Sequence, residues 1–231
     1  RPAWAPDGSR ILFDQAQQIY IANPNGTGVV QLTSAGSTSL IAQAEQLLPR
    51  TDLLLFADFN YGCLPQPVVE TLSAIARAHN VVVCADSQAS SQISDISRYK
   101  GMDLITPTER EARLALQDFE AGLVVVAEEL QRRAQARHVL ITLGGEGLLA
   151  YAHKDGAFMT DRLPAFNASP MDPAGAGDSL FAATSMGLAS GANFWETAYL
   201  GALAAACQVS RVGNVPLTVD ELVGEMEHVE A

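Results

Sequence analysis

Between residues 37 and 231, short apolar runs alternate with amphipathic segments, and this alternation constrains the fold more than any other feature. The apolar runs are nearly continuous, as expected of strands that are buried on both faces. They occupy residues 51–58, 81–86, 102–107, 138–144 and 147–153. Helical patterns occupy residues 37–48, 65–80, 108–117, 123–136, 177–191, 194–211 and 218–227. The alternation predicts an α/β fold with a mostly parallel sheet, helices on both faces, and ligands at the carboxyl ends of the strands.

The first 35 residues follow a different pattern, in which short β runs alternate with the turn sequences "PDG" and "NPNGTG". This segment resembles one repeat of the TolB-type β-propeller family. The resemblance rests on residues 2–9, 19–21, 25–28 and 32–33. A single repeat cannot bury both of its faces. We therefore expect residues 1–35 to be the tail of a longer array, a fusion scar, or a hairpin that docks on the domain formed by residues 36–231.

Composition limits the classes of partner. The chain has 231 residues, 48% of them hydrophobic, which suffices for one large domain or two small ones. Its net charge of −12 argues against nucleic acids and anionic membrane surfaces as partners. The sequence has neither a run of about eighteen apolar residues nor a secretory signal, so we expect no spanning helix. Because the chain begins with Arg1, we expect a fragment or a processed chain.

The cysteines and histidines carry no recognisable site. Cys63, Cys84 and Cys207 are odd in number, far apart and in apolar contexts. They are typical of buried, reduced thiols in a cytoplasmic protein. The four histidines show no metal-ligand spacing.

Three small residues, Gly175, Ala176 and Gly177, stand directly before Asp178 at the predicted start of a helix. Small residues leave backbone N–H groups unshielded and a helix N-terminus adds a positive dipole, so this stretch suits an anion such as phosphate. A carboxylate would repel that anion unless it has a function. Phosphoryl transfer supplies one, because the carboxylate takes the proton of the attacking hydroxyl while the amides stabilise charge. In the alternative, the glycines only shape a loop and Asp178 caps the helix.

Residues 172–191 resemble the C-terminal signature of the PfkB/ribokinase family of sugar kinases, with Pro173 and Ala174 in place of the usual middle pair. The resemblance implies a ribokinase-like fold and ATP-dependent phosphorylation of a sugar or sugar-phosphate hydroxyl with Mg²⁺. It implies that residues 175–177 form the anion hole and that Asp178 is the catalytic base. It also implies that Asp172 contacts a monovalent cation such as K⁺; a turn before Pro173 is the alternative.

The stretch "LITLGGEGLLAYA" contains a second motif of this family. Thr142, Gly144 and Gly147 match a Thr-x-Gly-x-x-Gly turn, which the resemblance places along the nucleotide. Taken alone, the same residues also predict a tight hairpin between two strands.

A third motif, "LITPTEREARLAL", resembles the family's Thr-Pro-Asn-x-x-Glu segment. Thr106, Pro107 and Glu111 match, and the resemblance places Glu111 at the water shell of Mg²⁺. Thr108 stands where asparagine is expected; its hydroxyl can bond a phosphate or water but lacks the amide donor pair. In the alternative, Glu111 is an ordinary exposed helix residue.

Two further segments resemble the heptose-phosphate kinase branch of the family. In "DFNYGCL", Asp58 and Gly62 match substrate residues, and Tyr61 replaces the usual lysine, which removes a cation that a phosphorylated substrate would contact. In "AAACQVSRVGNVPLT", Asn214 is implied to border the adenine. Helix packing alone is the alternative for residues 204–207.

The kinase motifs stand in family order, whereas the family's N-terminal half is not recognised and the propeller-like repeat occupies its place. We expect an ATP-binding carbohydrate kinase that acts on a small sugar or sugar phosphate. The resemblance also leaves a homodimer open, since related kinases often pair through a lid, a segment that is not recognised here. The missing half favours a rival, a catalytically impaired nucleotide-binding or scaffold module of the same fold. A second rival is an interaction protein built around the propeller repeat.

Overall fold

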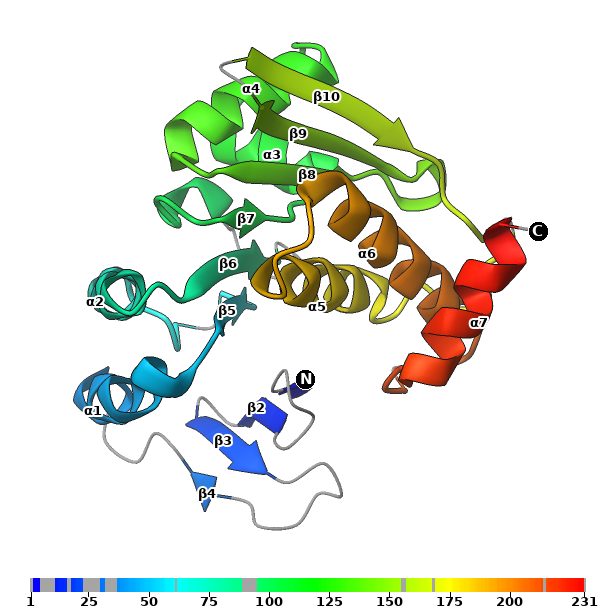
Figure 1. Ribbon diagram of the computed structural model, residues 1–231. Helices are drawn as coiled ribbons and strands as arrows, with labels where there is room; N and C mark the ends of the chain where they lie inside the picture. Colours follow the sequence, from blue (N-terminus) through cyan, green and yellow to red (C-terminus); the bar gives the residue numbers. More distant parts are fainter. Residues whose placement is uncertain are drawn as a thin grey trace.

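The structure is a computed structural model, and it describes every residue except 1, 5–10, 16–17, 23–29, 32–36, 61, 89–94, 155–156, 168, 214 and 231. A six-stranded sheet in the order β10-β9-β8-β7-β6-β5 forms its centre (Figure 1). The strands are β5 (Leu53–Asp58), β6 (Val82–Ser87), β7 (Leu104–Ile105), β8 (His138–Thr142), β9 (Leu148–Lys154) and β10 (Ala157–Leu163). Strands β5 to β8 are parallel to one another, and β9 and β10 are antiparallel. The predicted α/β fold with a mostly parallel sheet is confirmed.

Helices cover both faces of this sheet (Figure 1). One face carries α1 (Ser37–Leu47), α2 (Gln66–Ala78), α3 (Glu109–Leu116) and α4 (Leu123–Ala134). The other face carries α5 (Ala176–Ala189) and α6 (Phe194–Val209), and α7 (Val219–Glu230) packs on α6. Short 3₁₀ helices lie in the connections: η1 (Leu48–Arg50), η2 (Ile96–Arg98) and η3 (Gly144–Glu146).

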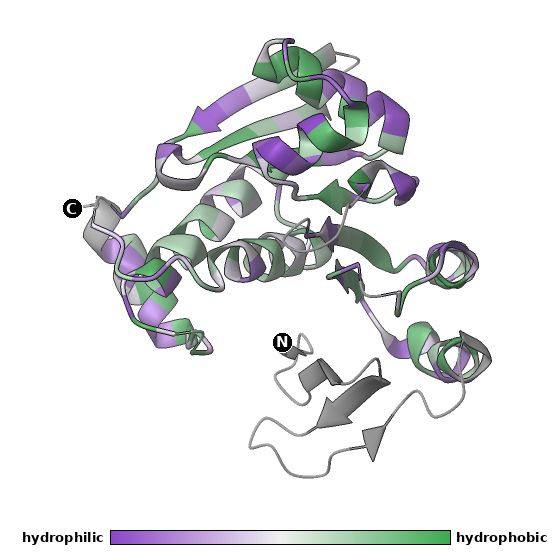
Figure 2. Cartoon of the chain, turned by 180° about the vertical axis from the view of Figure 1, so that it is seen from behind, coloured by the Kyte–Doolittle hydropathy of each residue, from purple (hydrophilic) through white to green (hydrophobic). Residues whose placement is uncertain are grey.

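Alternate side chains of each strand enter two separate cores, one on each face. Val83 and Ile105 pack towards α1 to α4, whereas their neighbours Cys84 and Leu104 pack towards α5 and α6. Because both faces are buried, these strands are apolar throughout rather than at every second residue. Figure 2 shows the hydrophobic colour continuing along the central strands, while hydrophilic residues gather on the outer sides of the helices.

Helices α5 and α6 pack closely at two glycines. A Cβ atom on Gly201 would lie 2.1 Å from Thr184 Oγ1, and one on Gly187 would lie 2.6 Å from Thr197 Cγ2. Only glycine fits at these two positions without a shift of the helices. The packing fixes the start of α5 and the end of α6 at one end of the sheet, where the parallel strands terminate.

The N-terminal segment forms a separate four-stranded antiparallel sheet in the order β1-β2-β3-β4. Its strands are β1 (Pro2–Trp4), β2 (Ile11–Gln15), β3 (Gln18–Ala22) and β4 (Val30–Gln31). The β character predicted for this segment is therefore confirmed. The two predicted turns, at residues 6–8 and 23–28, lie outside the described residues.

The three cysteines are free thiols. Cys84 and Cys207 are buried as predicted, but Cys63 is only half-buried because it lies in the irregular segment after β5. Burial raises the pKa of the Cys84 thiol to about 12, so that thiol stays protonated. In the part of the chain that the structure describes, the helices are too short or too polar to cross a membrane.

Candidate active site

The carboxyl ends of the four parallel strands bring residues from separate motifs to one edge of the sheet. Strand β5 ends at Asp58, β6 ends next to Gln88, β7 leads into Thr106, and β8 ends at Thr142. The Thr142 amide donates to the Pro107 carbonyl at 2.9 Å, which holds the ends of β7 and β8 together. This is the edge at which open α/β sheets bind ligands.

Helix α5 begins at the same edge with the predicted anion hole. Gly175 is its N-cap residue at φ 82°, a left-handed conformation that strains any residue with a Cβ atom. A Cβ atom on Gly177 would meet nothing within 4 Å, so the space beside this backbone is open. The Ala176 amide donates to the Pro173 carbonyl at 3.3 Å, so a bound anion would compete with an internal acceptor for it. The 14-residue helix adds its dipole to the site.

Asp178 lies in the first turn of α5 and is half-buried. The Gln88 side chain donates from Nε2 to Asp178 Oδ1 at 3.2 Å. Because Gln88 directly follows β6, this contact connects Asp178 to the carboxyl edge of the sheet, while its other carboxylate oxygen, Oδ2, is shielded from solvent. The predicted base and anion hole are therefore adjacent, at the place where a ligand would bind.

A second carboxyl group, which the sequence analysis did not single out, lies near Asp178. Asp86, in β6, is 8% exposed, and its Oδ1 accepts a hydrogen bond from Thr106 Oγ1 at 3.1 Å. Burial, and then the negative charge of Glu111 and that of Asp178, raise the pKa of Asp86 to about 8. Interacting carboxyl groups with shifted pKa values are typical of functional sites. The sequence signal that could have identified Asp86 is the position of an aspartate at the carboxyl end of an apolar strand.

Glu111 is buried, so the alternative of an ordinary exposed helix residue is wrong. It forms a capping box with Thr108 at the start of α3. The N–H and the Oγ1 of Thr108 each donate to Glu111 Oε2 at 2.8 Å, and the Glu111 amide donates to Thr108 Oγ1 at 3.2 Å. Thr108, in the position where asparagine was expected, thus starts the helix and fixes the Glu111 carboxylate close to Asp86.

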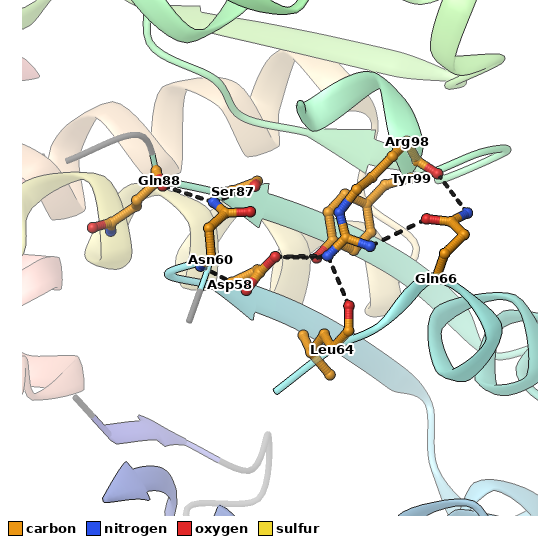
Figure 3. A network of polar contacts seen from close by, with 8 residues as sticks. All are labelled: Asp58, Asn60, Leu64, Gln66, Ser87, Gln88, Arg98 and Tyr99. Atoms are coloured by element: carbon orange, nitrogen blue, oxygen red, sulfur yellow. Dashed lines mark hydrogen bonds and ion pairs between the residues drawn. The ribbon is translucent and has the colours of Figure 1, made fainter. Parts of the chain in front are cut away.

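Asp58 lies at the centre of a polar network at the end of β5 (Figure 3). It is 5% exposed, and its Oδ2 accepts from Arg98 Nη2 at 2.7 Å and from the Tyr99 hydroxyl at 2.8 Å. Arg98 also donates to Gln66 Oε1 at 3.1 Å and to the Leu64 carbonyl at 2.9 Å. The carboxylate of Asp58 is therefore engaged within the protein, and it fixes the segment that follows β5.

Asn60 connects this network to β6 (Figure 3). Its amide N–H donates to Asp58 Oδ1 at 2.8 Å, while its Nδ2 donates to Ser87 Oγ at 3.1 Å and to the Gln88 carbonyl at 2.8 Å. A chain of contacts thus leads from Asp58 through Asn60 and Gln88 to Asp178. Gly62, the other predicted substrate residue, lies in the same segment at φ 86°, and a Cβ atom there would meet nothing within 4 Å.

The predicted nucleotide turn follows β8 at the same edge. Gly144 starts η3 at φ 60°, and the Leu143 amide donates to the Gly147 carbonyl at 2.8 Å. A Cβ atom on Gly147, which has φ 93°, would lie 2.0 Å from the Leu163 carbonyl oxygen. The turn therefore joins two antiparallel strands, β8 and β9, in the hairpin that the sequence alternative predicts. A hairpin at this edge is compatible with nucleotide contacts, so the nucleotide role of Thr142, Gly144 and Gly147 stays a prediction.

Asp172 holds together two loops at the start of α5. Its Oδ1 accepts from the Ala174 amide and its Oδ2 from the Gly213 amide, each at 2.9 Å. Both hydrogen bonds lower the pKa of Asp172, and the one from Ala174 has the larger effect. The next residue after Gly213, the predicted adenine contact Asn214, lies outside the described residues.

A cavity of about 300 Å³ lies at the opposite end of the sheet, where the parallel strands begin. Its lining includes Asp103, Arg137, His138 and Trp195. Burial, and then the positive charge of Arg137, lower the pKa of His138 to about 4, so its ring is neutral at physiological pH. None of the predicted site residues lines this cavity, so we place the functional site at the carboxyl edge.

Comparison with known proteins gives the family. The sequence model for pfkB family carbohydrate kinases matches residues 13–219. The chain belongs to this family. The TolB-type resemblance of residues 1–35 is not supported, since the pfkB match itself begins at residue 13, inside that segment.

Curated relatives of this pfkB-family chain include the bifunctional protein HldE from two bacteria. The protein from Paramagnetospirillum magneticum is 32% identical over 190 residues, which is 80% of this chain and 37% of the relative. The protein from a Caulobacter species is 32% identical over 194 residues, 82% of this chain and 38% of the relative. The chain thus spans less than half the length of the curated relatives it matches.

Solved structures show that the pfkB-family chain has the ribokinase-like fold. Phosphofructokinase-2 from Escherichia coli, in complex with potassium, has a TM-score of 0.70 at 14% identity and covers 93% of this chain and 71% of its own. Ribokinase from Thermotoga maritima has a TM-score of 0.66 at 23% identity and covers 89% of this chain and 67% of its own.

Proposed function

We propose that residues 36–231 act as an ATP-dependent carbohydrate kinase domain, which transfers the γ-phosphoryl group to a hydroxyl of a sugar or sugar phosphate. The observation that carries this proposal is the position of Asp178. It stands directly after the small residues 175–177 at the start of α5, it accepts a hydrogen bond from Gln88, and its charge, like that of Glu111, acts on Asp86.

In the proposed step, the Asp178 carboxylate takes the proton of the acceptor hydroxyl while that oxygen bonds to the γ-phosphorus. The bond between the γ-phosphorus and the oxygen that bridges it to the β-phosphorus breaks, and ADP leaves. Backbone N–H groups of residues 175–177 and the dipole of α5 stabilise negative charge on the transferred group. Gln88 orients the carboxylate through its hydrogen bond to Asp178 Oδ1.

The acidic groups at this edge fit a hydrated Mg²⁺ ion. Among the described residues, no cluster of three or more His, Cys, Asp or Glu side chains could hold a metal ion. Magnesium suits such a site, because it usually keeps several waters and is bound by one or two carboxylates together with substrate phosphates. When bound, it offsets the charge of the phosphates. We assign Glu111 as the residue that orients its water shell.

The remaining residues divide the carboxyl edge of the sheet into a nucleotide side and a sugar side. We assign Thr142, Gly144, Gly147 and Asn214 to the nucleotide side. Strand β8 ends at the same edge of the sheet, and Gly213, the residue before Asn214, donates to Asp172 close to the start of α5. Gly62 belongs to the sugar side. We assign Asp58 as a positioning residue for that side, since its carboxylate is occupied by Arg98, Tyr99 and Asn60.

A heptose phosphate is the preferred substrate class within this proposal. The segments 58–64 and 204–218 resemble the heptose-phosphate kinase branch, and the HldE relatives agree with that choice. A cytoplasmic location belongs to the same proposal, and a homodimer is compatible with it.

The test is ADP release with a panel of sugars and sugar phosphates, measured for the wild type, Asp178→Asn and Asp161→Asn. Loss of a general base lowers the rate by about 10²–10⁴-fold, so Asp178→Asn should lose turnover by this factor and keep ATP binding. Asp161 is exposed on β10, so its substitution should leave the rate unchanged. Equal rates for all three proteins would reject Asp178 as the base. ATP binding without turnover by the wild type would instead favour the non-catalytic nucleotide-binding module.

A further inference from the structure

The family resemblance implies a monovalent cation at Asp172, and a family structure with potassium exists. The groups around Asp172 do not fit such an ion. Both carboxylate oxygens already accept backbone N–H groups, one from Ala174 and one from Gly213. A cation in this place would also need oxygen ligands, and the carbonyls of the same two residues are backbone candidates.

Those two carbonyls are taken by a buried side chain. Gln208, in the last turn of α6, is 0% exposed. Its Nε2 donates to the Ala174 carbonyl at 3.2 Å and to the Gly213 carbonyl at 2.9 Å. Its Oε1 accepts from Arg211 Nη2 at 3.3 Å. Both N–H groups and the oxygen of this amide are therefore used, as a buried amide requires.

Asp172 and Gln208 thus hold the same two loops in complementary ways. The carboxylate of Asp172 binds the two amides, and the side-chain amide of Gln208 binds the two carbonyls of Ala174 and Gly213. The N–H groups of Gln208 give the carbonyls the positive partial charge that a cation would otherwise supply. An ion bound by these two carbonyls would compete for them with the fully buried Gln208 side chain, and loss of the Gln208 hydrogen bonds is costly.

We propose that the Gln208 side chain replaces a monovalent cation in holding the anion-hole loop, so that this protein does not depend on K⁺. Ala174 directly precedes Gly175, and Gly213 directly precedes Asn214. Gln208 is therefore a positioning residue that connects the anion hole to the adenine side. This role in ATP binding rests on the proposed kinase function, whereas the role in holding the two loops does not.

The first experiment uses the wild-type chain in KCl, NaCl or choline chloride at equal ionic strength. The melting temperature and the Kd for ATP should be the same in all three salts. A melting temperature that K⁺ raises above its value in the other salts would overturn the inference. If the wild type binds no ATP in any salt, the kinase proposal fails, while the melting temperatures still decide the role of the cation.

The second experiment compares Gln208→Ala, Gln208→Met and the control Gln131→Ala. Gln131 also donates to a backbone carbonyl, that of Ala136, but at the end of α4. Gln208→Ala leaves two carbonyls without their donor and opens space, so ATP should bind about tenfold more weakly and K⁺ should restore both binding and melting temperature. Methionine fills the space, so K⁺ should restore neither. The inference is wrong if K⁺ fails to stabilise Gln208→Ala, or stabilises Gln131→Ala equally; if Gln208→Ala does not fold, the wild-type salt series decides.

Discussion

Two aspartates at the carboxyl edge differ in their surroundings, and that difference separates their roles. Asp178 is half-buried in the first turn of α5, and we propose that it is the catalytic base. Asp86 is buried beside Glu111 and holds a hydrogen bond from Thr106. With its pKa raised to about 8, Asp86 is mainly protonated at neutral pH and adds little negative charge where phosphate would bind. A neutral Asp86 therefore repels a bound phosphate less than a carboxylate would.

The raised pKa of Asp86 predicts a pH-dependent stability. The unfolded carboxyl loses its proton near 3.8 and the folded one near 8, so between these values the folded state binds more protons. Stability is then highest at low pH and falls as pH rises towards 8, by at most about 1.4 kcal/mol per pH unit. Asp86→Asn mimics the protonated group and should flatten this fall. Urea unfolding at several pH values measures it, with Asp161→Asn as the control; an unchanged slope in Asp86→Asn contradicts the assignment.

The contact between α5 and α6 sets the site at the scale of elements. Because α5 begins and α6 ends at the carboxyl edge, their close packing positions the proposed anion hole at the start of α5 relative to Gln208 near the end of α6. Gly187 and Gly201 make this approach possible. Gly201 of α6 thus serves helix packing. The sequence analysis gave this same role as the alternative for residues 204–207, which follow on the same helix.

Gly201→Ala should therefore destabilise the protein. The new Cβ atom would lie 2.1 Å from Thr184 Oγ1 and 3.0 Å from the Leu180 carbonyl, so the helices must move apart, at a cost of about 1–3 kcal/mol. Gly224→Ala in α7 is the matched control, because its Cβ atom would meet nothing within 4 Å and alanine favours a helix. Denaturant unfolding should show that Gly201→Ala lowers the free energy of unfolding and that Gly224→Ala raises it. Equal changes for the two substitutions would reject the close-packing argument.

At the scale of the whole molecule, the chain carries a net charge of −12, while the proposed ligand is an anionic nucleotide. Long-range repulsion between them is screened by salt, since the Debye length falls from about 30 Å at 0.01 M to about 10 Å at 0.1 M. The local amides, which attract the phosphates at short range, are screened much less.

ATP binding should accordingly tighten as choline chloride is raised from about 0.01 M to about 0.1 M at constant Mg²⁺. Isothermal titration at several salt concentrations measures the trend. Weakening of ATP binding with salt would show that surface cations, rather than the backbone of residues 175–177, dominate the attraction.

The sequence alone predicted most of the architecture. Short apolar runs without alternation indicated strands buried on both faces, and the helical segments between them predicted a mostly parallel sheet. The sequence pattern also placed four polar residues at one edge of the sheet, because each lies at the end of a predicted strand or the start of a predicted helix: Asp58, Thr106, Thr142 and Asp178. The β character of residues 1–35 was also predicted correctly, whereas their assignment to a propeller repeat found no support. Short turn-rich β sequences carry little information about the family to which they belong.

Only the tertiary structure decided what surrounds each of these residues. Asp86 has a raised pKa because burial and Glu111, which comes from another element, act on it together. Gln208 reaches the carbonyl of Ala174, which lies 34 residues earlier in the chain, because α6 folds back beside the start of α5. Propensity and periodicity report local preferences, and so they determined where strands and helices form. Solvent exclusion and hydrogen bonding between distant segments depend on the completed packing, and so they determined which polar groups are charged, engaged or open to a ligand.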